Sequence, residues 1–260
     1  MSHPTSILAP DEPRAAAVVQ AIRAGDVPTL KELLRANPDL ATARVGTVGG
    51  SCTAARSLLH IATDWPGHLP NGAATVRALV EAGADVNARF VGDHTETPLH
   101  WAASNDDVEV LDALIDLGAD IEARGAIIAG GTPISDATAF GQWKAARRLI
   151  ERGARTTFWE ASALGLEERV EAFFRGSTPP TAQEVTEALW GACHGGQPKV
   201  AEYLLARGAE LNWVGWDGLT ALEAAQREGH ADLAAWLRDQ GAKTAAEIEV
   251  APAGQTNHRA

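Results

Sequence analysis

Four titratable side chains in this sequence have the types and the neighbours that acid–base chemistry needs. They are Asp64, His94, Glu96 and His194. A carboxylate beside a histidine, in a partly apolar surrounding, is an arrangement in which pKa values shift and protons move near neutral pH. We take these four as the candidate catalytic residues if the protein is an enzyme. The alternative interpretation is a set of capping and loop-bridging contacts.

Metal and nucleophile chemistry have weaker support. His60 and Asp64 are four residues apart on one predicted helix face, and a similar His-carboxylate pair lies at 94 and 96, so a mixed metal site could converge. The chain has no H-E-x-x-H motif, no C-x-x-C pair and no calcium loop. Neither Ser104 nor Cys193 lies on a nucleophile elbow, and no glycine pair has the Walker spacing. We therefore expect no metal and no cofactor.

The elements that must position these residues are repeated helix pairs. The clearest copy begins Thr97-Pro98-Leu99-His100-Trp101-Ala102-Ala103, has apolar residues at helical spacing over 108–115, and ends at Gly118-Ala119-Asp120. Thr97 can cap a helix that starts at Pro98, and Gly118 suits a left-handed C-cap. This stretch resembles an ankyrin repeat, whose T-P-L-H-x-A signature recurs about every 33 residues. Because one helix pair cannot bury its own apolar face, the resemblance implies a stack.

The resemblance covers roughly residues 14–243. It predicts an all-α ankyrin-repeat solenoid of about seven helix-turn-helix units with short β-turn finger loops. The expected units are 14–44, 55–89, 90–124, 125–157, 158–180, 181–213 and 214–243. The first matches only the second half of a repeat and the fifth is degenerate. Residues 1–13 are expected to be an N-terminal arm, disordered or merely draped, and residues 244–260 a flexible tail.

Two departures from the usual repeat stand out. Gly83, Gly118 and Gly153 are 35 residues apart, and the residues in excess of the usual period must fall in the finger loops. The finger at 125–131 is apolar, so we expect it to pack on a neighbouring finger, another subunit or a ligand. An insertion at 65–72 separates the two helices of its unit, and its prolines and glycines forbid a continuous helix.

The ankyrin resemblance implies that inner helices and fingers line a concave groove. Aligning the units on one another gives the candidate residues for ligand or partner binding: Asp64, Trp65, His68, His94, Glu96, Trp101, Ser104, Asn105, Phe140, Trp190, His194, Trp213, Trp216 and Asp217. The chain has eight tryptophans; those near the groove either fill gaps or wall a pocket for a partly apolar ligand. The histidines at 60, 100 and 230 occupy family positions that tie neighbouring loops together.

Composition excludes several kinds of partner. With 34 acidic against 22 basic side chains the net charge is −12, which repels phosphate backbones and anionic lipid, so we expect neither nucleic acid nor membrane as a partner. Residues 1–14 lack the regions of a secretory leader. Cys52 and Cys193 are expected to be free thiols in a reducing cytoplasm. The excess of arginine over lysine, with abundant Ala, Gly and Pro, suggests a bacterial gene.

Two functions remain open at this point. The resemblance implies recognition, in which the groove and finger loops bind a partner protein without chemistry. The alternative is a small-molecule-binding protein or an enzyme, whose pocket of Trp, His and carboxylate side chains performs acid–base chemistry. An enclosed cavity that holds Asp64, Trp65, His94 and His194 together would favour the alternative. The sequence does not indicate the oligomeric state.

Overall fold

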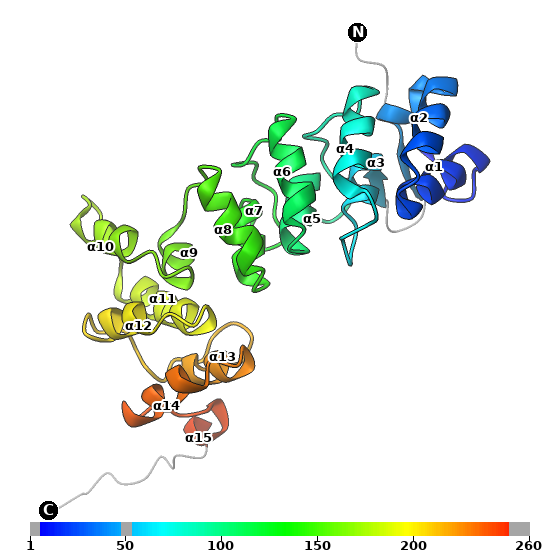
Figure 1. Ribbon diagram of the computed structural model, residues 1–260. Helices are drawn as coiled ribbons and strands as arrows, with labels where there is room; N and C mark the ends of the chain where they lie inside the picture. The colour runs from blue at the N-terminus through cyan, green and yellow to red at the C-terminus, as the bar shows by residue number, and fades with distance from the viewer. Residues whose placement is uncertain (1–5, 48–53, 250–260) are drawn as a thin grey trace, which may run out of the picture. The chain divides into compact units, whose positions relative to one another are not determined.

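The computed structural model describes residues 6–47 and 54–249, and it divides into a first unit, residues 1–155, and a second unit, residues 156–260. Within each unit, consecutive helices pair along the chain (Figure 1). The helices of the first unit are α1 (Pro13–Ala24), α2 (Val27–Ala36), α3 (Leu58–Ala62), α4 (Gly72–Glu81), α5 (Pro98–Ser104), α6 (Val108–Asp116), α7 (Pro133–Ala139) and α8 (Trp143–Glu151), with a 3₁₀ turn η1 (Pro38–Thr42).

The second unit continues the same pattern. Its helices are α9 (Phe158–Ala163), α10 (Glu167–Arg175), α11 (Ala182–His194), α12 (Pro198–Leu205), α13 (Ala221–Arg227), α14 (Ala231–Asp239) and α15 (Ala245–Glu249). The described residues therefore form seven helix pairs, α1/α2 to α13/α14, followed by one short helix. The predicted helical repeat fold is confirmed.

Local sequence explains where these helices begin and end. From α5 onward the inner helices start after a threonine cap; in α13, the N–H of Thr220 donates to Glu223 Oε2 at 2.9 Å, which completes a capping box. Outer helices α4, α6, α8, α12 and α14 are followed by glycine in the left-handed region, as at Gly118 with φ 94°. These five repeats thus close with a turn that other residues adopt only with strain.

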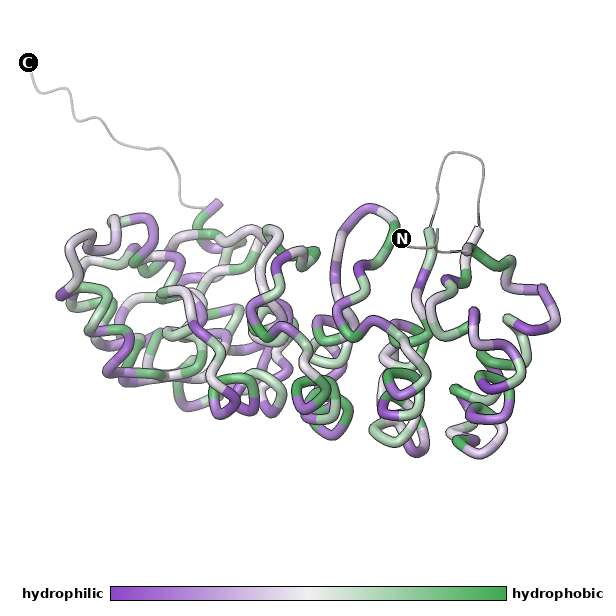
Figure 2. The backbone as a smooth tube through the Cα atoms, turned by 90° about the horizontal axis from the view of Figure 1, so that it is seen from above, coloured by the Kyte–Doolittle hydropathy of each residue, from purple (hydrophilic) through white to green (hydrophobic). Residues whose placement is uncertain are grey.

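The core of each unit is built from small and branched side chains. In the first unit, Leu59, Leu79, Leu99, Leu114 and Ile134 are almost wholly buried between successive helix pairs. The second unit has its own cluster, in which Leu189, Leu204 and Leu222 pack with many alanines. In Figure 2 apolar and polar residues alternate along the helical turns, as expected when each helix buries one face.

A three-stranded sheet is the feature that the sequence analysis did not predict. Strand β1 (Ile7–Leu8) runs parallel to β2 (Arg44–Thr47), and β2 pairs antiparallel with β3 (Ala54–Ser57). The expected loose arm at 1–13 is therefore wrong for residues 7–8, because their backbone joins a sheet edge, and Pro13 already begins α1. The first repeat also has both of its helices, α1 and α2, although only its second half matched the repeat pattern.

The insertion at 65–72 is fastened to the repeats on both sides. The side-chain amide of Asn71 donates to the carbonyl of Gly25 at 2.9 Å. The backbone N–H of His68 donates to Asp107 at 2.8 Å, and its ring Nε2 lies 3.0 Å from the carbonyl of Asn105. The insertion does interrupt the helices, as predicted, and its exposed His68 acts as a bridge between repeats rather than as a pocket residue.

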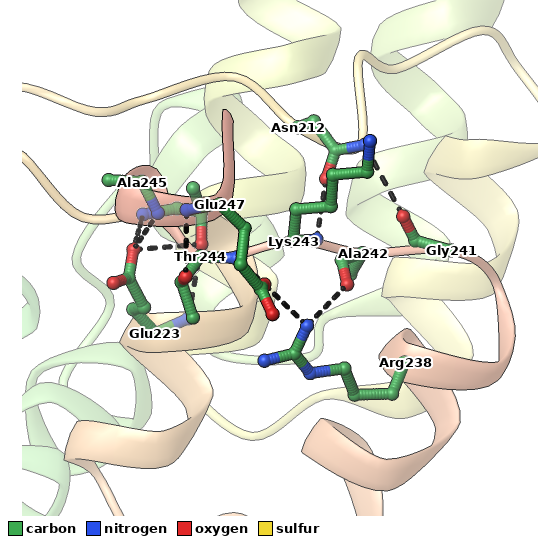
Figure 3. A network of polar contacts seen from close by, with 10 residues as sticks. Asn212, Glu223, Arg238, Gly241, Ala242, Lys243, Thr244, Ala245 and Glu247 are labelled. Carbon is green, nitrogen blue, oxygen red and sulfur yellow. Dashed lines mark hydrogen bonds and ion pairs between the residues drawn. The ribbon is translucent and has the colours of Figure 1, made fainter. Parts of the chain in front are cut away.

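The C-terminal segment is more ordered than expected. Residues 245–249 form α15, and a polar network holds it against the last helix pair (Figure 3). Arg238 donates to Glu247 at 2.6 Å and to the carbonyl of Ala242 at 3.1 Å, while the N–H of Ala245 donates to Glu223 at 3.0 Å. The flexible-tail prediction is therefore wrong for 245–249, because polar side chains of α13 and α14 fix its first turn. Residues 250–260 lie outside the described residues.

The two cysteines of the sequence are differently placed. Cys193 is a buried free thiol in α11, and burial raises its pKa to about 12, so it is a core residue rather than a nucleophile. Cys52 lies outside the described residues. Across residues 6–47 and 54–249, none of the helices has the length and apolar character that a membrane span requires.

Candidate functional site

Two inner helices of the first unit, α5 and α7, position the candidate site. Helix α5 begins after Thr97, whose N–H donates to His100 Nδ1 at 3.1 Å. Helix α7 begins in the same way with Ser135 in place of the histidine. Because the two starts are equivalent, Trp101 in α5 corresponds to Asp136 in α7. Both residues lie beside the loop that carries the predicted acid–base groups.

The repeat histidines of the first unit are structural, as expected. His60 Nε2 lies 3.1 Å from the carbonyl oxygen of Glu96, and its Nδ1 lies 2.7 Å from Ser57 Oγ, so both ring nitrogens are in use. His100 makes the matching but longer approach to the carbonyl of Gly131, at 3.5 Å. Burial lowers the pKa of His60 to about 3 and that of His100 to about 4. Both rings are therefore neutral at pH 7.

A single open pocket of about 510 Å³ gathers most of the predicted site residues of the first unit. We call it the first-unit pocket, and define it by its lining residues: Asp64, Trp65, His94, Glu96, Trp101, Ser104, Asn105, Ile127, Phe140 and Gln142. Eight of these ten side chains are among those that repeat alignment selected. Ile127 and Gln142 were not selected, because the alignment of repeats considered only the last turn of each inner helix and the finger residues just before each inner helix.

Glu96 is the best-anchored polar group of this pocket. Its Oε1 accepts the backbone N–H of Ile127 at 2.8 Å, and its Oε2 accepts Trp101 Nε1–H at 2.7 Å. His94 Nδ1 lies 3.0 Å from the same Oε2, away from the direction of a good hydrogen bond, and its ring stacks on Phe90 with centroids 4.4 Å apart. The carboxylate is thus fixed in one orientation while still lining the pocket.

Asp136 is the functional candidate that sequence reasoning missed. It is fully buried, and neither carboxylate oxygen has a hydrogen-bond donor at normal geometry in the described chain. Burial and the adjacent Glu96 carboxylate both raise the pKa of Asp136, to about 8, with burial the larger cause. At neutral pH Asp136 is therefore protonated beside Glu96, and we call these two residues the carboxyl pair. A signal existed in the sequence, since Asp136 precedes the predicted Phe140 by one helical turn.

Three other predicted residues of the pocket make hydrogen bonds or ion pairs within the first unit. Asp64 accepts Arg56 Nη1 at 2.5 Å and the N–H of Trp65 at 3.1 Å. Asn105 donates its side-chain amide to the carbonyl of Thr63 at 2.9 Å. Ser104 Oγ donates to a carbonyl of the preceding turn in α5. Asp64 is therefore an ion-paired rim residue, which weakens its candidacy as a general base.

The apolar finger at 125–131 differs from expectation. Ile127 and Ile128 are exposed, and only Ala126 is buried. The finger folds on itself, with the N–H of Ala126 donating to the carbonyl of Gly131 at 3.1 Å. The prediction that it packs on a neighbouring finger is wrong for its two isoleucines, because the turn directs them to solvent at the pocket edge.

In the second unit, Trp190 and His194 belong to a packed cluster. His194 is only 2% exposed, and its ring stacks on Trp190 with centroids 5.4 Å apart. His194 Nδ1 lies 3.4 Å from Arg227 Nη2 and 3.5 Å from Glu228 Oε1. Trp190 Nε1–H donates to the carbonyl of Leu219 at 3.1 Å. The expectation that these two side chains face a groove is wrong, since the cluster buries them, and His194 is not in the first-unit pocket.

The finger of the second unit carries the other three predicted residues. Trp213 and Trp216 meet edge to face, with centroids 5.2 Å apart, and Trp216 is 68% exposed. Asp217 accepts Arg227 Nη1 at 2.7 Å. A bridge between Val214 and Thr220 closes this finger as a short hairpin. Trp216 is therefore an accessible aromatic, whereas Asp217 is committed to an ion pair.

The geometry limits the chemistry that these residues can perform. Within residues 6–47 and 54–249, no three His, Cys, Asp or Glu side chains are grouped to hold a metal ion. Three of the four catalytic candidates, Asp64, His94 and Glu96, share the first-unit pocket, and His194 does not. What the pocket offers is the Glu96 carboxyl group in its lining, the protonated carboxyl group of Asp136 behind it, and aromatic walls.

Comparisons with known proteins agree with the repeat architecture. Residues 18–125 match the family model described as ankyrin repeats (3 copies). An ankyrin repeat and KH domain-containing protein of Caenorhabditis briggsae is 32% identical over 176 residues, which is 64% of this chain. The chain spans only 6% of the length of that relative.

Among solved structures, the ankyrin repeat domain of human ASB11 aligns with 85% of this chain and 96% of its own, at 20% identity and a TM-score of 0.49. The sequence match to the repeat family covers the first-unit helices from α1 to α6. The capped helix pairs continue beyond it through α14. Residues 18–125 are therefore similar to ankyrin repeats, within a chain of repeated helix pairs.

Proposed function

We propose that this chain is a recognition protein that binds a partner protein through its inner helices and finger loops, with the first-unit pocket as the principal contact. The observation that carries this proposal is where the exposed apolar side chains lie. In the described part of the first unit the large exposed ones are Trp65, Ile127, Ile128 and Phe140. Three of them line the pocket, and Ile128 adjoins Ile127. Such a gathering marks an interaction site.

The openness of the pocket favours a protein partner over a small molecule. Trp65 is 83% exposed and Phe140 is 48% exposed. A small-molecule site normally encloses about 70–90% of its ligand, which these walls cannot do. Exposed aromatic side chains around a depression are instead typical of protein interface anchors, whose loss often costs more than 2 kcal/mol of binding free energy.

A small-molecule or acid–base function is the second candidate, and one observation favours it. The carboxyl pair holds a proton within the protein beside a lining carboxylate, an arrangement suited to proton transfer. Asp136 itself is buried, so any transfer would pass through Glu96. The test is tryptophan emission during titration with fractionated metabolites, because a ligand that stacks on Trp65 changes the emission, and Trp65→Phe removes that response.

Selection from a displayed random-peptide library tests the recognition proposal. Peptides enriched on the full chain are measured again on the double variant Trp65→Ala/Phe140→Ala, with Trp216→Ala as the matched control of similar exposure in the second unit. We expect the double variant to lose at least about tenfold in affinity and the control to lose little. Equal binding by the double variant and the unaltered chain would reject the first-unit pocket as the contact site.

A further inference from the structure

Glu96 in the lining of the first-unit pocket, and Asp136 behind it, form no ion pair with a lysine or arginine of the described chain. The described ion pairs engage Arg56 with Asp64 at the rim, and none joins a lysine or arginine to Glu96 or Asp136. Arg89, on the same finger as Glu96, donates to the backbone carbonyls of Thr95 and Arg124 instead. The neighbouring basic side chains therefore leave the carboxyl pair without a compensating cation.

Asp136 adds an observation independent of the acidic composition. It lies in α7 one turn before Phe140, the residue that caps this helix at its C-terminus and lines the pocket. Its side chain is completely buried, and neither carboxylate oxygen makes a hydrogen bond of normal geometry, although Glu96 and the backbone of Ile128 approach it. Buried polar groups are normally hydrogen-bonded, and an unpaired one is costly. A cation arriving from a bound partner would lie on Glu96 and place a positive charge near Asp136 as well.

The walls suit the same kind of ligand. Trp65, Trp101 and Phe140 line the space above the carboxyl pair. A cation is attracted to aromatic faces as well as to carboxylates. An anion would be repelled by the acidic side chains, and an apolar group would leave the charge of those side chains uncompensated. The net charge of −12 also draws basic partners toward the protein.

We propose that the first-unit pocket receives a lysine or arginine side chain from the partner protein, with the cationic head on Glu96 and the aliphatic stem between Trp65 and Phe140. This inference rests on the proposed recognition function and names the chemistry of the partner segment. Glu96 is buried but lines the pocket; Ile127 occupies one position on Oε1 and Trp101 one on Oε2, where His94 Nδ1 also lies 3.0 Å away, so Oε1 is the oxygen that would accept the incoming N–H. The long stem of a basic side chain covers apolar surface while its head stays on the carboxylate.

A double-mutant cycle on a selected peptide tests the inference. Each basic residue of the peptide is changed in turn to norleucine, which keeps the stem and removes the charge, and affinity is measured on the full chain and on Glu96→Gln. One basic residue should lose at least about tenfold on the unaltered chain and far less on Glu96→Gln. Glu81→Gln, an exposed change of equal charge in the same unit, is the control and should leave the cycle unchanged.

The outcomes separate this inference from the proposed function. Peptides that need Trp65 and Phe140 but no basic residue would overturn the cation inference and leave partner recognition standing. Peptides whose binding is unaffected by Trp65→Ala/Phe140→Ala would overturn both. Because norleucine replaces a residue of the peptide and not of the protein, its effect on the unaltered chain shows whether a basic residue is needed even if Glu96→Gln folds poorly.

Discussion

The two units of this protein use similar side chains to different ends. In the first, Trp101, His94 and Glu96 line an open pocket. In the second, Trp190, His194 and Glu228 come together with Arg227, which lies near His194 Nδ1 and pairs with Glu228 at 3.0 Å. Both clusters combine an indole, an imidazole and a carboxylate on inner-helix and loop positions of the repeat.

What separates the clusters is access and charge compensation. The second-unit cluster includes an arginine and buries its histidine, so its polar groups contact one another. The first-unit cluster has two carboxyl groups and no lysine or arginine partner within the described residues, and exposed aromatic side chains surround it. Residue type alone therefore does not distinguish a packed cluster from a binding surface in repeats of this kind.

The largest expected effect is the loss of packing in the second unit. Trp190→Ala removes a buried indole that stacks on His194 and donates to the carbonyl of Leu219. We expect the free energy of unfolding of the second unit to fall by about 3–5 kcal/mol. Hydrogen exchange of α11 and α13 amides measures this. A loss below about 1 kcal/mol would mean that the cluster is not a packing element.

The carboxyl pair should impose a pH dependence on the first unit. The pKa of Asp136 is about 8 in the folded state and about 3.9 in the unfolded chain, so the folded state binds more protons between these values and stability falls as pH rises. His60 and His100, with lowered pKa values, act oppositely: their contribution is lost as pH falls below about 6.5.

These opposing terms predict a maximum in the stability of the first unit near pH 6.5, with a decline of a few kcal/mol at most toward about pH 8. Asp136→Asn should remove the decline, because the amide has no charge to bury. Glu160→Gln, at a buried cap carboxylate of the second unit, should preserve it. Hydrogen exchange of α5 and α7 amides across this pH range makes the comparison; a decline that persists in Asp136→Asn would assign it to another group.

The insertion gives a smaller effect confined to the first unit. Asn71 has a left-handed backbone, with φ 53°, and its amide donates to the carbonyl of Gly25. Asn71→Ala loses the bond and strains the backbone, so we expect a loss of about 2 kcal/mol. Asn71→Gly loses only the bond, about 1 kcal/mol. Urea denaturation measures the free energy of unfolding of both variants. Equal losses would show that the left-handed backbone at this position does not affect stability.

The smallest effect on stability should accompany a large effect on binding. Trp65→Ala removes an indole that is almost wholly in solvent, so the unfolding free energy should change by less than about 0.5 kcal/mol. The same variant should weaken peptide binding markedly. A stability loss comparable to that of Trp190→Ala would place Trp65 among the packing residues and remove the contrast between the units.

Much of the fold could be predicted from the sequence, because residues within a repeat mark where its helices begin and end. The threonine that precedes Pro98 and the glycine at 118 fix a helix pair locally, without reference to the rest of the chain. The sheet could not be predicted in this way. Ile7–Leu8 becomes a strand only because β2, far along the chain, offers a free edge.

The site was predictable in part for a related reason. Alignment of repeats selects residues by position, and eight of the fourteen selected side chains do line one pocket. It cannot tell whether a later element covers the position, as Arg227 and Leu219 cover His194 and Trp190. It also passed over Asp136: the spacing of Asp136 from Phe140 was a signal, but the aligned positions lay at the ends of the inner helices, and nothing local indicates that a carboxylate from another repeat lies beside Asp136.

The carboxyl pair is tested most directly by NMR of the full chain labelled with ¹³C at aspartate carboxyl carbons. We predict that the Asp136 signal titrates with a midpoint near pH 8, and that Glu96→Gln lowers the midpoint without returning it to the ordinary range, since burial is the larger cause. A midpoint near the ordinary value of about 3.9 in the unaltered chain would contradict the account. Asp136 would then be solvated or paired, and the first unit would lack the buried, protonated carboxyl group that distinguishes it from the second unit in this account.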